Sequence, residues 1–326
     1  MPRILRKESN ILMTESINTP KLRFALPYAV IGISLAVLSA ILRCINLVFF
    51  FDSDIGYYQR GAVLPILSVI LLAASVVFFA VCSILWFRKS PVTYAKTPSW
   101  AVRIGAFVAV AGFIALVAFD ILGVVAGAKL SIVNLLFGVL SIAYFVMLAL
   151  DKGQDGLRVL CGFCVILRLL ISLAGSYFNI FIQMNAPDKL FFHLGCLGGM
   201  LFLISELRAL LANPRPALHL FSCGAATLFL GVASLPSIVA YYSGLLTDDT
   251  VLGGYYMLFG LFVYTAIRLL SLALTPIGNE PSTEETTDTP EEPAPIEEVE
   301  APNEEMTESN ETEETVTIEE RNEDPS

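Results

Sequence analysis

Long apolar runs dominate the first 274 residues of the chain, and most charged side chains stand near the ends of these runs. A helix rises about 1.5 Å per residue, so roughly 20 apolar residues are needed to cross a hydrocarbon core of about 30 Å. The buried strands of a soluble α/β protein would instead give runs of about 4–8 residues separated by turns. The pattern therefore predicts a helical membrane protein.

Eight such runs predict an all-α fold, a polytopic bundle of transmembrane helices. The predicted spans are 25–51, 61–87, 100–126, 130–150, 157–183, 190–211, 216–245 and 251–274. The count of eight depends most on the short connection at 127–129, which must separate the third span from the fourth. The first run follows a long polar leader and contains Arg43, which is not expected of a cleaved signal peptide.

Residues 275–326 form a strongly acidic C-terminal segment. They hold 19 Asp and Glu but a single basic residue, Arg321, with many Thr and Pro and few large apolar side chains. Such a segment buries too little apolar surface to offset the entropy of ordering it, so a disordered tail is predicted. Two roles stay open: a solvated, self-repelling extension, or an arm that docks a basic protein partner or the chain's own basic loops.

Basic side chains are divided unequally between the two sides of the predicted bundle. If the N-terminus is cytoplasmic, fourteen Lys and Arg flank the cytoplasmic ends of the spans, and only Arg60, Lys129 and Lys189 flank the other ends. Lys and Arg near span ends are retained in the cytoplasm. We therefore expect a multi-pass protein of the cell membrane. Because the sequence has no eukaryotic-style sorting signal, we expect this membrane to be a bacterial cytoplasmic membrane. Residues 1–24 would be a basic cytoplasmic segment, and the even number of spans would place the C-terminus in the cytoplasm too.

Ionisable side chains inside the spans are the best candidates for function, because a charge in hydrocarbon is costly and usually faces a bundle interior or a water-filled cavity. Arg168 lies ten residues beyond Arg158, about 15 Å along the helix and near the middle of its span. Arg43 and Asp120 are the other charged candidates. We expect an Arg43–Asp120 or an Arg168–Asp120 pair, because pairing lowers the cost of burying both charges.

Polar side chains gather in the predicted outer half of the bundle, which suggests a water-accessible pocket open to the outside. The candidate intramembrane polar site comprises Arg43, Asp120, Asn134, Arg168, Asn179 and His193. The alternative for each is structural: an ion pair for Arg168, and for His193 an interhelical hydrogen bond worth roughly 0.6–2 kcal/mol rather than a proton relay. Glu206 and Arg208 are expected to be interface residues near the inner boundary.

Prolines and glycines in the spans predict particular backbone features. Pro65 and Pro236 each remove an amide donor and should free a carbonyl for another partner. The pairs Gly123-xxx-Gly127 and Gly195-xxx-Gly199 predict close helix crossings. A possible duplication of two four-span halves rests on the recurrence of Ile41-Leu42-Arg43 as Ile166-Leu167-Arg168, which would make a parallel repeat.

Motifs of known chemistry are missing from the sequence. It has no phosphate-binding loop, no His-Glu-x-x-His zinc motif and no serine-hydrolase motif, so neither an enzyme nor a bound cofactor is expected. The pair Cys161-x-x-Cys164 would supply two of the four ligands of a structural metal site, and it is interpreted as a packing feature. No basic, aromatic-rich soluble surface for nucleic acid is present.

Two functions follow from these expectations. The first is a non-enzymatic membrane protein of scaffolding, assembly or regulatory type, because nothing in the spans demands transport. The second is a small-solute or ion transporter with a polar pocket around Arg168, Arg43 and Asp120. The lipid bilayer is the one partner that both require, and neither specifies an oligomeric state.

Overall fold

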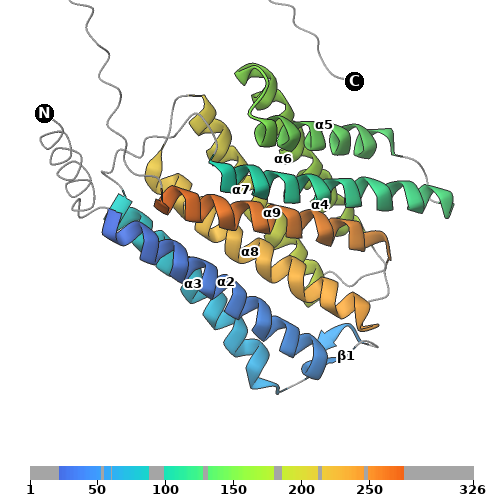
Figure 1. Cartoon of the computed structure of the whole chain (residues 1–326). Coiled ribbons are helices and arrows are strands. Elements are labelled where there is room, and N and C mark those ends of the chain that lie inside the picture. Colours follow the sequence, from blue (N-terminus) through green and yellow to red (C-terminus); the bar gives the residue numbers. More distant parts are fainter. Residues whose placement is uncertain are drawn as a thin grey trace, which may run out of the picture. The chain divides into compact units, whose positions relative to one another are not determined.

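The computed structural model describes residues 22–52, 55–59, 61–87, 99–127, 131–179, 186–211, 215–245 and 249–274, and these ranges contain eight long helices and one short hairpin (Figure 1). The helices are α2 (Leu22–Phe50), α3 (Val63–Phe87), α4 (Trp100–Val125), α5 (Ile132–Leu150), α6 (Asp155–Phe178), α7 (Pro187–Leu210), α8 (Pro216–Tyr242) and α9 (Asp249–Leu274). In the hairpin, β1 (Phe51–Asp52) pairs antiparallel with β2 (Tyr57–Tyr58). The predicted acidic tail and nearly all of segment 1–24 lie outside the described residues.

All eight helices are long and apolar enough to cross a membrane, which confirms the all-α fold and, for the described residues, the count of eight such helices. The doubtful connection after α4 is a real break: Gly127 has a φ of 101°, and Ser131 caps α5 by accepting a hydrogen bond from the amide of Asn134 at 3.3 Å. At the α6–α7 connection, α6 ends at Phe178 and α7 begins at Pro187. Proline favours the first position of a helix, so two residues predicted for the loop, Asp188 and Lys189, belong to the first turn of α7.

The helices α4 to α9 form a closed ring. Each packs against the next along the chain, and α9 returns to pack along α4. The helices α2 and α3 lie outside the ring against α8, as Figure 1 shows. We call the end that carries the α2–α3, α4–α5, α6–α7 and α8–α9 connections the hairpin end, and the other the opposite end. The start of α2 and the end of α9 both lie at the opposite end (Figure 1).

Glycines allow the ring to close between α4 and α9. A Cβ atom on Gly112 would lie 2.7 Å from the carbonyl oxygen of Tyr256, and one on Gly260 would lie 3.1 Å from the Cα of Ala109. Because these contacts are to backbone, no side chain can move aside to make room. This crossing was not predicted, since the two helices are far apart in the sequence.

Of the predictions for the two glycine pairs and Pro65, one is confirmed and two are wrong. Close packing at Gly195 is confirmed, because a Cβ atom there would lie 2.8 Å from Ala233. The prediction for Gly123-xxx-Gly127 is wrong, because α4 ends before Gly127. Pro65 is also not a kink: it lies in the first turn of α3, where no amide donor is needed.

The packing does not follow the possible duplication of two four-span halves. In such a repeat α3 would correspond to α7 and α4 to α8. The helices α7 and α8 pack closely, whereas α3 makes at most a marginal contact with α4. The two halves of the described bundle are therefore built differently.

Candidate functional site

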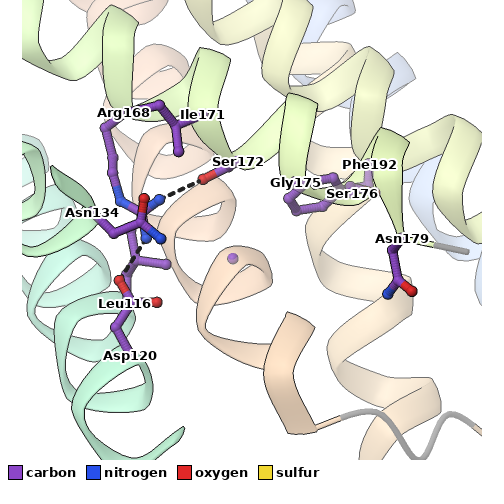
Figure 2. Close-up of a pocket in the computed structure, with 11 residues that line it drawn as sticks. Leu116, Asp120, Asn134, Arg168, Ile171, Ser172, Gly175, Ser176, Asn179 and Phe192 are labelled. Atoms are coloured by element: carbon purple, nitrogen blue, oxygen red, sulfur yellow. Dashed lines mark hydrogen bonds and ion pairs between the residues drawn. The ribbon is translucent and has the colours of Figure 1, made fainter. Parts of the chain in front are cut away.

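A pocket of about 180 Å³ lies inside the ring toward the hairpin end, and α4, α5, α6, α7 and α9 contribute to its lining (Figure 2). Its polar lining comprises Asp120, Asn134, Arg168, Ser172, Ser176 and Asn179. Leu116, Ile171 and Phe192 supply apolar surface. Four of the six predicted site residues therefore meet in one cavity: Asp120, Asn134, Arg168 and Asn179.

An ion pair between Arg168 and Asp120 is the central feature of the pocket. The Nη2 of Arg168 donates to Oδ2 of Asp120 at 2.6 Å, and Nη1 donates to Oγ of Ser172 at 3.1 Å (Figure 2). The Arg168 side chain is 3% exposed and that of Asp120 is 30% exposed. Of the two predicted pairings, this one is confirmed, and the arginine is the buried partner while the carboxylate is the accessible one.

The pocket also contains residues that the sequence analysis missed. Ser172 and Ser176 follow Arg168 at intervals of four residues on α6. Residues four apart lie on the same face of a helix, so this spacing was the signal that could have identified them. Gly175 lines the same cavity, and a Cβ atom there would meet nothing within 4 Å.

Arg43 belongs to a different cluster, so the alternative Arg43–Asp120 pairing is wrong. Because α2 packs outside the ring on α8, the arginine faces α7 and α8 rather than α4. Its Nη2 lies 2.7 Å from Oδ1 of Asp188 and donates to Ser237 at 3.2 Å, and its guanidinium lies 4.2 Å from the centre of the Phe191 ring. The side chain is only 1% exposed, so the protein encloses this guanidinium.

Pro236 completes this second cluster. Its missing amide leaves the carbonyl of Val232, four residues earlier on α8, without its helical donor. Arg43 donates to that carbonyl and, at 3.3 Å, to the carbonyl of Ala233. The expectation that Pro236 frees a carbonyl for another partner is confirmed.

The hairpin and α9 also contact this cluster. Tyr255 of α9 donates a hydrogen bond to Asp188, which also accepts one from Ser237 at 2.7 Å. Burial raises the pKa of the Tyr58 hydroxyl in β2, and the nearby positive charge of Arg43 partly opposes this. Arg43 thus joins α2 to α7 and α8, and Asp188 extends the cluster to α9.

His193 and Lys189 lie on α7 outside the pocket lining. The His193 ring lies 6.3 Å from that of Tyr177, and its Nε2 has no hydrogen-bond partner among the described residues. Lys189, predicted as a base that flanks a span end, is 3% exposed and donates to the carbonyls of Tyr177 and Asn179 at 3.1 and 3.0 Å. A cation at these carbonyls compensates the negative end of the α6 dipole.

An aromatic layer fills the ring between the pocket and the opposite end. Ring centroids lie 5.0 Å apart for Tyr144 and Phe145, 5.3 Å for Phe145 and Tyr264, and 5.8 Å for Phe202 and Tyr264. Phe113 stacks on Phe145 at 5.5 Å. All five side chains are buried, and they come from α4, α5, α7 and α9.

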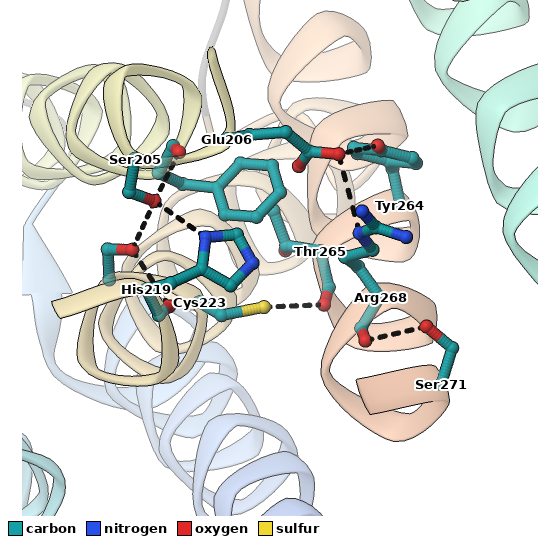
Figure 3. Close-up of polar contacts among 10 residues, drawn as sticks. Ser205, Glu206, His219, Cys223, Tyr264, Thr265, Arg268 and Ser271 are labelled. Carbon is teal, nitrogen blue, oxygen red and sulfur yellow. Dashed lines mark hydrogen bonds and ion pairs between the residues drawn. The ribbon is translucent and has the colours of Figure 1, made fainter. Parts of the chain in front are cut away.

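A buried polar cluster lies on α7, α8 and α9 beside this layer (Figure 3). Oε1 of Glu206 accepts a hydrogen bond from Tyr264 at 2.7 Å and lies 3.3 Å from Nε of Arg268. Glu206 is 2% exposed, so its prediction as an interface residue is wrong. Its partner Arg268 is one of the fourteen bases that were predicted to flank the cytoplasmic ends of the spans. Next to them, Ser205 lies 3.0 Å from Nδ1 of His219.

The cysteines of the predicted CxxC pair, Cys161 and Cys164, are free thiols buried on α6.

No family model, curated protein or solved structure matches the chain.

Proposed function

We propose that this protein is a membrane transporter that carries a small polar solute through the ring formed by α4 to α9. The observation that supports this proposal is the polar pocket that reaches the Arg168–Asp120 pair inside the bundle. The sequence alone favoured a scaffolding, assembly or regulatory role. The pocket favours the transporter alternative, although Arg43 is no longer part of its site.

The position of the pocket suits transport. Arg168 lies near the middle of α6, and the substrate sites of many transporters lie near the middle of the bilayer. A static scaffold gains nothing from a polar cavity at this depth, because ionisable groups there are expensive. With a volume of about 180 Å³, the cavity is smaller than the roughly 300–1,000 Å³ of pockets for drug-sized ligands, so the solute is small.

The two halves of the ring differ in a way that suits alternating access. The hairpin half contains the pocket, whereas the aromatic layer and the Glu206–Arg268 pair occupy the opposite half. In the orientation favoured by the basic flanks, with cytoplasmic termini in a bacterial cytoplasmic membrane, the pocket opens to the outside. The described conformation then corresponds to an outward-facing state.

Thiol labelling tests whether water reaches the pocket. In a background without the six native cysteines, Ser176→Cys is expected to react with a membrane-impermeant methanethiosulfonate reagent added from outside. The matched control is Ser234→Cys on α8, which replaces a fully buried serine and is expected to stay unlabelled. A Ser176→Cys protein that folds but is labelled no faster than the control would contradict the proposal.

Weakening the Glu206–Arg268 pair in the opposite half of the ring is expected to open the pocket to the cytoplasmic side. Glu206→Gln removes the negative charge that compensates Arg268, which favours a conformation with that end open. Labelling of Ser176→Cys from the cytoplasmic side of inverted vesicles is therefore expected to increase severalfold. Arg208→Gln, two residues away on α7, is the control. A static scaffold would show the same one-sided labelling in both variants.

A further inference from the structure

We infer that the solute is a small zwitterion whose ammonium and carboxylate groups are separated by one or two carbon atoms, as in an α-amino acid. This inference rests on the proposed function and identifies the class of solute that the pocket accepts. It is based on the charge balance of the pocket, the hydrogen-bonding capacity that remains in the Arg168–Asp120 pair, and the short distance between the two charges.

The charges that line the pocket sum to zero. Asp120 and Arg168 are its charged lining residues in the described part of the chain, and their contacting atoms are 2.6 Å apart. A solute with a net charge would introduce an uncompensated charge into a region of low dielectric constant, which is costly. A zwitterion has no net charge, so the charges in the pocket still sum to zero when it is bound.

Each member of the pair retains hydrogen-bonding capacity. Oδ2 of Asp120 accepts from Arg168, and a carboxylate with two oxygens can accept further donors. On Arg168, Nη1 and Nη2 each donate one of these hydrogen bonds and each carries a second N–H group, and the buried Nε has no acceptor among the described residues. An ammonium group at Asp120 and a carboxylate at the remaining N–H groups of Arg168 would use this capacity, and each contact would join two groups of opposite charge.

The geometry also limits the size of the solute. Because the two protein charges are in contact, the two charges of the solute must be close together to reach both. The cavity of about 180 Å³ leaves room for a short side chain, and Leu116, Ile171 and Phe192 offer it apolar surface. A long zwitterion with widely spaced charges would not place both groups at the pair.

Binding to the purified full-length protein in detergent tests the inference, with alanine as the probe. Acetate and methylammonium each carry one of its two charges, and 6-aminohexanoate carries both at a larger separation. Alanine is expected to bind at least tenfold more tightly than each of these three, as measured by calorimetry or by the shift in unfolding temperature.

Two leucine variants on α6 show whether binding occurs in the pocket. Gly175 and Gly156 both have open space at the position of a Cβ atom, but only Gly175 lines the cavity. Gly175→Leu is expected to weaken alanine binding at least tenfold, and Gly156→Leu is expected to leave it unchanged. Equal effects of the two substitutions would show that alanine binds elsewhere and would overturn the inference.

The outcomes separate this inference from the proposed function. If acetate or methylammonium binds as tightly as alanine, or if alanine does not bind, the inference that the solute is a zwitterion is overturned. In either case, labelling of Ser176→Cys from one side leaves the proposal of a transport pocket standing. If Ser176→Cys is unlabelled as well, the proposed function fails with it.

Discussion

Replacing Asp188 by alanine is expected to be among the most destabilising single changes in the bundle, at about 3–5 kcal/mol. The substitution removes the carboxylate that lies 2.7 Å from Arg43 and leaves a guanidinium that is 1% exposed without its counter-charge. The remaining carbonyl and hydroxyl acceptors do not neutralise that charge. Because Arg43 joins α2 to α7 and α8, the outer helix pair should loosen first. Reversible unfolding of the purified protein in mixed detergent micelles measures the loss.

A double variant distinguishes loss of charge compensation from loss of packing. Arg43→Met together with Asp188→Ala removes both charges and keeps an apolar side chain of similar length. Replacement of a buried pair by apolar groups is often nearly neutral, so the double variant is expected to recover most of the stability lost in Asp188→Ala. If the double variant is no more stable than the single one, the ion pair does not explain the effect.

Gly112→Ala is expected to open the ring between α4 and α9. The added Cβ atom would lie 2.7 Å from the carbonyl oxygen of Tyr256 and 3.2 Å from the Cα of Gly260. Overpacking of this kind costs about 1–3 kcal/mol, because the two backbones must separate and take their side chains with them. The free energy of unfolding in detergent measures this loss, and larger residues at position 112 should increase it.

The same substitution at Gly175 is the matched control, because a Cβ atom there would meet nothing within 4 Å. Without a clash, alanine is preferred to glycine inside a helix by about 0.5–1 kcal/mol. Gly175→Ala is therefore expected to be neutral or slightly stabilising. A loss of unfolding free energy in Gly112→Ala with no loss in Gly175→Ala would support the close backbone crossing. Equal changes in the two variants would contradict it.

Sequence alone was sufficient for the helices. Whether a segment crosses a membrane depends on its length and its own side chains, so 100–126 was predicted almost as α4 is observed. Boundaries shifted where capping decided the end, as at Pro187, which moved Asp188 from a loop into a helix. The polar candidates were also recognised from the sequence, because a buried charge stands out in an apolar run whatever its partner.

Tertiary structure alone decided how those residues combine. Arg43 and Arg168 follow the same dipeptide Ile-Leu, yet one pairs with Asp188 on α7 and the other with Asp120 on α4. Likewise, nothing local connects Glu206 with Arg268, or Gly112 with Gly260. The sequence determined that this chain forms eight apolar helices carrying a few charges, because hydrophobicity acts locally. Only the packing of α2 outside the ring, and the return of α9 to α4, determined which charges meet and where a pocket remains, because pairing depends on contacts between helices far apart along the chain.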